Sequence, residues 1–65
     1  MIRVGEDTFL SVMAMYRKVE VRESVSEVCF YHGEKVGYYD RLKVAHYVKS
    51  EDIRRLTGSG RSDSQ

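Results

Sequence analysis

Tyrosines interleaved with basic residues are the side chains of this sequence best suited to binding a ligand. Four of the five tyrosines, Tyr31, Tyr38, Tyr39 and Tyr47, lie among Arg22, Lys35, Arg41, Lys43 and Lys49. Aromatic faces beside Arg or Lys are what the bases of single-stranded nucleic acid, or a peptide, stack on. The alternative is that two or three of these rings complete a small core and leave only their hydroxyls in water.

The adjacent pair Tyr38 and Tyr39 narrows the choice of contact residues. Neighbours on a strand point to opposite faces, so at least one of the two rings is expected at the surface. An exposed tyrosine beside Arg41 is the best single candidate. The predicted binding residues are Arg22, Tyr31, Tyr38, Tyr39, Arg41, Lys43, Tyr47, Arg54 and Arg55.

The single cysteine is the other reactive side chain. Cys29 and His32 have a C-x-x-H spacing, and Asp40 and His46 follow, which could serve a metal in principle. On a strand, however, Cys29 and His32 point to opposite faces, which prevents joint ligation. Cys29 with His46 could form a nucleophile and its base, but nothing supplies an oxyanion hole. We therefore expect Cys29 to fill the core, with no metal, no cofactor and no enzymatic activity.

The elements that must position these residues are predominantly strands. Val, Ile, Tyr, Phe and Thr together number 20, against 8 for Ala, Leu and Met. β-branched and aromatic side chains fit a pleated, half-buried surface and are restricted in a helix. Strands are predicted at residues 2–4, 18–22, 28–31, 36–41 and 44–48. Residues 8–16 fit either a strand or a helix, because apolar positions recur at both spacings.

Two local sequence features predict a turn and a helix start. Gly33 suits the first central position of a type II′ turn, so we expect a hairpin with a Gly33-Glu34 loop. In that register His32 faces Lys35, Phe30 faces Gly37, and Val28 faces Tyr39. Ser50 can cap a short C-terminal helical turn, whose Ile53 and Leu56 point inward.

The predicted fold is mostly β: a small five-stranded antiparallel SH3-like barrel or curved sheet, with strands in consecutive order and a C-terminal helical turn. Residues 1–57 form one domain, and residues 58–65, which contain no apolar side chain after position 58, form a flexible tail. The net charge of +1 excludes a strongly basic arm. No apolar stretch suits a membrane span or a signal peptide, so a cytoplasmic protein without membrane contact is expected.

Two stretches resemble known families. Residues 18–41 resemble the SH3-like C-terminal barrel of integrases and transposases, which implies a surface that binds DNA or other protomers. Residues 24–33, 38–42, and Tyr47 with residues 51–56 are similar to a MerR-type winged helix-turn-helix. That second resemblance implies a helix at residues 24–33 and a truncated DNA-binding regulator, since only four residues separate Gly33 from Tyr38.

The functional hypothesis is a non-enzymatic regulatory or accessory module that contacts nucleic acid through a Tyr/Arg surface. The alternative is a protein-binding adaptor or inhibitor that uses exposed aromatic rings and a free strand edge. A homodimer is also possible, because a core this small gains stability by burying flanking apolar surface. Near-neutral charge does not exclude nucleic acid if the basic residues cluster.

Overall fold

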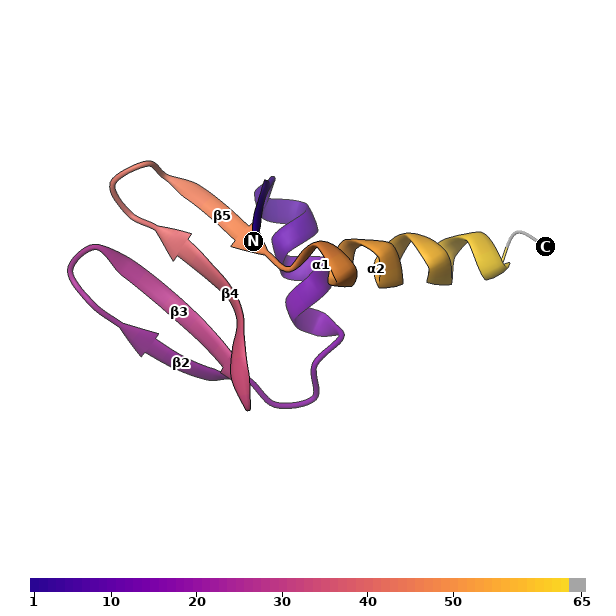
Figure 1. Ribbon diagram of the computed structural model, residues 1–65, viewed down its shortest axis with the longest axis horizontal. Helices are drawn as coiled ribbons and strands as arrows, with labels where there is room; N and C mark the ends of the chain where they lie inside the picture. The colour runs from indigo at the N-terminus through magenta and orange to yellow at the C-terminus, as the bar shows by residue number, and fades with distance from the viewer. Residues whose placement is uncertain (64–65) are drawn as a thin grey trace.

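The computed structural model describes residues 1–63, with side chains described for residues 1–57. Its elements are β1 (Ile2–Val4), α1 (Glu6–Ala14), β2 (Glu20–Glu23), β3 (Glu27–His32), β4 (Glu34–Asp40), β5 (Ala45–Val48) and α2 (Ser50–Asp63). Figure 1 shows the strands as one curved antiparallel sheet with α1 beside it and α2 extending away from it. The predicted mostly β fold, with five antiparallel strands and a C-terminal helix, is confirmed.

The order of strands across the sheet is β1-β5-β4-β3-β2. The sheet is therefore open, with free edges at β1 and β2, and it does not close into a barrel. The expectation of consecutive order is wrong for the first strand, since β1 pairs with β5, with Arg3 opposite Tyr47. The physical reason is α1, which carries the chain between β1 and β2 so that they need not be neighbours.

The ambiguous segment 8–16 is largely helical, as part of α1. Phe9 and Val12 are the buried residues of this helix. The ring of Phe9 packs edge-on against Phe30, with centroids 5.1 Å apart. Both periodicities were present in the sequence, and the helix prevails because the sheet needs a cover for its apolar face. Burial against the sheet is thus what selects the helical alternative.

Gly37 lets α1 approach the sheet closely. A Cβ at this position would lie 3.0 Å from Met13 Cε, 3.0 Å from the Tyr47 carbonyl oxygen and 3.1 Å from Phe9 Cε1. Phe30 lies opposite Gly37 across the strands, as the hairpin register predicts. Met13 packs partly buried against the core cluster, so it contributes to the covered side of the sheet.

The hairpin between β3 and β4 departs from the prediction near its turn. Gly33 has a φ of 80°, the left-handed conformation that favours glycine. The pairs Val28–Tyr39 and Phe30–Gly37 are confirmed, but His32 lies opposite Glu34 rather than Lys35. An irregularity after Phe30 leaves Val36 without a cross-strand partner, and Val36 is only 1% exposed. The shift therefore lets one extra apolar side chain enter the core.

Two further segments, β3 and α2, each differ from one expectation for their secondary structure. Residues 27–32, where the resemblance to the MerR-type family implies a helix, form the strand β3. The helix α2 continues from Ser50 to Asp63, well beyond the single turn expected. Ile53 and Leu56 pack against the core as predicted. The helical backbone thus runs through most of the segment 58–65, whose side chains lie outside the described residues.

Candidate binding face of the sheet

The register of the strands places one row of side chains across the whole sheet. Arg22 lies opposite Cys29, Cys29 opposite Tyr38, Tyr38 opposite Tyr47, and Tyr47 opposite Arg3. Directly paired residues point to the same side of a sheet. The row therefore crosses all five strands on one face, with two tyrosines inside it and an arginine at each end. We call this side, with the neighbouring Tyr31 and Lys35, the Tyr/Arg face.

The aromatic rings of the Tyr/Arg face are held by stacking and by cations. Tyr38 and Tyr47 stack with centroids 4.7 Å apart and planes 12° from parallel. The Arg22 guanidinium carbon lies 4.6 Å from the centroid of Tyr31, and Lys35 Nζ lies 5.1 Å from that of Tyr38. Cation–π contacts of this kind favour positive charge directly above an aromatic plane. The face thus combines oriented rings with cations placed directly beside them.

The Tyr/Arg face is accessible, whereas the opposite side of the sheet carries the core. The Arg22 side chain is 63% exposed, and Tyr31, Tyr38 and Tyr47 are all half-buried. On the opposite side, Phe9 of α1 packs against Phe30 and tilts over His46 at 4.9 Å. Half-exposed rings present part of their surface to solvent, which a stacking ligand requires.

Of the predicted binding residues, Arg22, Tyr31, Tyr38 and Tyr47 come together on the Tyr/Arg face. Tyr39 points to the other side, as the alternation predicts, where its ring lies 4.6 Å from that of His46. Four others lie away from the face: Arg41 donates to Glu23 Oε1 at 2.8 Å, Lys43 belongs to the β4–β5 turn, and Arg54 and Arg55 belong to α2.

Sequence reasoning did not include Arg3 and Lys35 among the binding residues. Lys35 was expected opposite His32, on the other side of the sheet, and only the irregularity after Phe30 pairs it with Tyr31 and brings it to Tyr38. Arg3 has no local signal either, because only the pairing of β1 with β5 brings it beside Tyr47. The place of Arg3 at the β1 end of the row could therefore not be predicted from the sequence.

Cys29 lies within the row and is 8% exposed, so its thiol is covered by larger neighbours. His32 points to the opposite side, where its ring lies 5.1 Å from that of Tyr16. Its Nδ1 also lies 2.8 Å from the Lys18 carbonyl oxygen. Across the described residues, no group of three His, Cys, Asp or Glu side chains is arranged to hold a metal ion. Nor is any described helix both long and apolar enough to cross a membrane.

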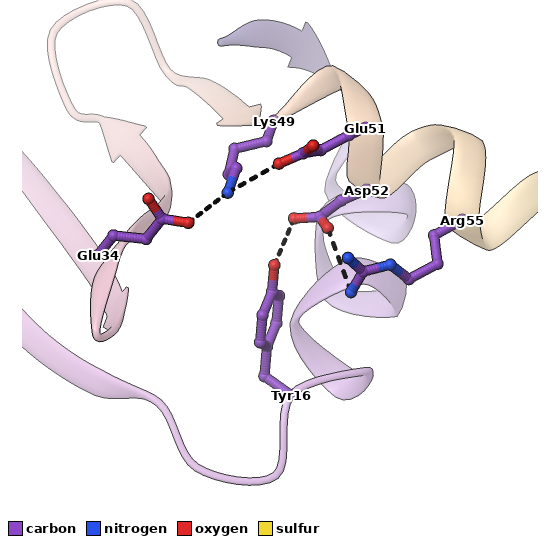
Figure 2. Close-up of polar contacts among 6 residues, drawn as sticks. All are labelled: Tyr16, Glu34, Lys49, Glu51, Asp52 and Arg55. Atoms are coloured by element: carbon purple, nitrogen blue, oxygen red, sulfur yellow. Dashed lines mark hydrogen bonds and ion pairs between the residues drawn. The ribbon is translucent and has the colours of Figure 1, made fainter.

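A polar cluster on the other side of the sheet joins α2 to the rest of the fold (Figure 2). Asp52, in the first turn of α2, is only 1% exposed. The Tyr16 hydroxyl donates to Asp52 Oδ2 at 2.6 Å, and Arg55 Nη1 lies 3.7 Å from Asp52 Oδ1. Burial, followed by the hydrogen bond to Asp52 and its negative charge, raises the pKa of Tyr16 to about 12. The phenol is thus neutral over the ordinary pH range and stays a donor.

Lys49, between β5 and α2, links β4 to α2 beside this pair, as Figure 2 shows. Its ammonium donates to Glu34 Oε2 at 2.6 Å and lies 3.0 Å from Glu51 Oε1. These two contacts, that with Glu34 first, raise the pKa of Lys49. The hydrogen bond from Lys49 in turn lowers the pKa of the Glu51 carboxyl. The hydrogen bonds of Tyr16 and Lys49 anchor α2 to the rest of the fold, whereas the buried Asp52 Oδ1 has only the Arg55 guanidinium at 3.7 Å and no hydrogen bond among the described side chains.

Comparison of the chain with protein-family models, with curated proteins and with solved structures finds no match. Among the described residues, the Tyr/Arg face is the arrangement that most directly fits a class of ligand, because it combines accessible rings with cations.

Proposed function

We propose that this chain is a non-enzymatic module that binds single-stranded nucleic acid through the Tyr/Arg face, in a regulatory or accessory role in the cytoplasm. The observation that carries the proposal is the stacked pair Tyr38–Tyr47 within a row that ends in Arg22 and Arg3. Bases stack on exposed aromatic rings regardless of sequence, and flanking cations contact the phosphates.

The dimensions of the row suit a short stretch of single strand. Adjacent strands lie ~4.8 Å apart, so the four spacings from β2 to β1 give a row about 19 Å wide. In the proposed complex, the two arginines that end the row contact phosphates on either side of the stacked rings. Each stacked base contributes ~1–3 kcal/mol in proteins of this kind.

The charge on the face predicts a modest salt dependence. Its cations Arg3, Arg22 and Lys35 are accompanied by the acids Glu20, Glu27 and Asp40 on the same side of the sheet. Asp40 Oδ1 is already engaged by the backbone amides of Leu42 and Lys43. If two or three phosphates are neutralised, log Kd should change with log salt concentration by a slope of roughly 1.4 to 2. Stacking then supplies the larger share of the affinity.

The test is a titration of a labelled oligo-dT or oligo-U strand, followed by fluorescence anisotropy at several salt concentrations. The double variant Tyr38→Ala/Tyr47→Ala should weaken binding by about tenfold or more, because two stacking surfaces are lost. Arg22→Ala should weaken binding and reduce the salt slope by about 0.7. Arg54→Ala, an exposed cation on α2, is the matched control and should leave both unchanged. Absence of any binding at low salt would refute the proposal.

One observation favours a second candidate, the protein-binding adaptor or inhibitor. The edge strand β2 is exposed along all four of its residues, so its free side is open to a strand from a partner. A protein partner held by backbone pairing and aromatic contacts would bind almost independently of salt. The same salt titration therefore separates the two candidates.

A further inference from the structure

The free edge of β2 carries a self-complementary pattern of side chains. Glu20 and Arg22 point to the Tyr/Arg face, with Val21 between them on the opposite side. Val21 is 50% exposed, although it lies in the same row as the packed side chain of Phe30. Within the chain, Arg22 Nη2 and Glu20 Oε1 are 3.6 Å apart, at two exposed side chains. An exposed contact of this length is weak, so both charges remain available to another partner.

We propose that a second copy of this chain pairs with β2, antiparallel and centred on Val21. In that register Glu20 lies opposite Arg22 of the second copy, and Arg22 lies opposite Glu20 of the second copy. Val21 meets Val21 of the second copy on the other side of the sheet. Two ion pairs and one apolar contact thus accompany the backbone hydrogen bonds that the free edge can make.

The neighbouring registers are excluded by charge. Centring the pair on Glu20 or on Arg22 brings two like charges directly opposite each other, which destabilises a sheet. A shift to the register between Val21 and Arg22 places Glu20 opposite Glu23 of the second copy. That register is also closed to a two-fold pairing of one strand edge, because it would set Val21 opposite Arg22 of the second copy, which points to the other side of the sheet. Among antiparallel two-fold pairings of β2, only the one centred on Val21 matches opposite charges.

This pairing has a structural consequence for the Tyr/Arg face. The two-fold axis stands perpendicular to the sheet, so the joined sheet presents the Tyr/Arg faces of both copies on one side. The contact is isologous and uses up the β2 edge of each copy, so it closes at a dimer. The proposal does not rest on nucleic-acid binding, and the experiments below measure association without any ligand.

The first test is a charge exchange followed by sedimentation equilibrium. Glu20→Arg and Arg22→Glu each turn two attractive pairs into repulsive ones, and each should weaken the dimer by about tenfold or more. The double variant Glu20→Arg/Arg22→Glu restores opposite charges across the axis and should return the wild-type association. Arg54→Glu, on α2, is the control and should have no effect. Far-UV circular dichroism of each variant establishes that it is folded.

The second test is a cross-link that preserves the fold. In the background Cys29→Ala, the variant Val21→Cys places two thiols at the axis, where cross-strand Cβ atoms lie ~4.5–5.5 Å apart, close to the reach of a disulfide. It should form a disulfide-linked dimer under mild oxidation much faster than Val25→Cys, whose native side chain is 94% exposed in the β2–β3 turn.

Three results would overturn the proposal. The first is a monomer at about 1 mM, where an association of about −4 kcal/mol is already half formed. The second is equal cross-linking of the two cysteine variants. The third is a double charge exchange that stays as weak as the single exchanges.

Discussion

The two faces of the sheet use the same residue types in opposite ways. On the face covered by α1, the aromatic rings contact one another: Phe9 packs on Phe30 and His46, and Tyr39 on His46. On the Tyr/Arg face, Tyr31 and Tyr38 contact cations instead, and the stack with Tyr47 stays partly exposed. The contrast shows that an aromatic residue signals a core or a binding surface only once its face is known.

The adjacent residues Tyr38 and Tyr39 express this difference within a single dipeptide. Tyr39 belongs to the core-side row, with Val28 and His46, and Tyr38 to the row that Arg22 and Arg3 terminate. Substitutions on the covered face should therefore mainly lower stability, and substitutions on the Tyr/Arg face should mainly weaken binding.

The largest expected effect lies on the covered face. Phe9→Ala removes a ring that is 3% exposed and should destabilise the fold by ~3–5 kcal/mol, which is enough to unfold a domain of this size. Leu10→Ala, at the next position of α1 but 57% exposed, should change stability by less than ~0.5 kcal/mol. Thermal denaturation followed by circular dichroism measures both. Equal losses would mean that α1 does not cover the sheet as described.

The adjacent tyrosines give the sharpest comparison. Tyr39→Ala should cost ~2–3 kcal/mol of stability, because a half-buried ring against His46 is lost. Tyr38→Ala loses a stack that contributes ~0.5–1.5 kcal/mol beyond the area that the half-buried ring covers, and it should still cost less than Tyr39→Ala because its site opens to solvent. It should also reduce the affinity for single-stranded nucleic acid by at least fivefold. Urea denaturation and anisotropy titration, run on both variants, give the two quantities. A reversed order of the two stabilities would contradict the assignment of faces.

The polar cluster on the covered side should make the stability of the fold depend on pH in the alkaline range. The pKa of Tyr16 is raised to about 12 in the folded chain, above its usual value near 10. Its contribution to stability is therefore complete below pH ~10 and is lost as the pH rises from there through about 12. Tyr16→Phe leaves the buried Asp52 without its donor and should cost ~1–3 kcal/mol at neutral pH.

Denaturation midpoints from pH 8 to 12 measure this effect. The wild type should lose more stability than Tyr16→Phe over the alkaline part of that range. Parallel curves for the two proteins would show that Tyr16 does not carry the effect. Tyr31→Phe, on the Tyr/Arg face, serves as the control for removal of a phenol.

The smallest expected effect concerns the turn that joins β4 and β5. Val44 has a φ of 51°, which is strained for a β-branched residue, and its side chain is 67% exposed. Val44→Gly should stabilise the fold by ~1–2 kcal/mol, because glycine adopts this conformation without strain. The greater conformational freedom of glycine in the unfolded chain should destabilise the fold by ~0.5–1 kcal/mol. The net result is a small rise in melting temperature. Val25→Gly, in the exposed β2–β3 turn, should instead lower the melting temperature slightly, and a fall in both would argue against strain at Val44.

Much of this layout was readable from local pattern. Alternation predicted the strands, and with them the separation of Tyr38 from Tyr39. The position of Gly33 predicted the hairpin and its pairs Val28–Tyr39 and Phe30–Gly37. These features depend on side-chain period and on the conformational freedom of glycine, both of which act over a few residues.

Tertiary structure decided the features that local pattern did not predict, because those features depend on contacts between distant segments. The choice of helix for α1 came from the need to cover Phe30 and Val48 with Phe9 and Val12. The pairing of β1 with β5 placed Arg3 beside Tyr47, and the fold brought Tyr16 to Asp52. The sequence by itself determined which residues alternate and where the chain turns. Only the packing of α1 on one side of the sheet decided which tyrosines would stay exposed, since burial is a property of the whole fold.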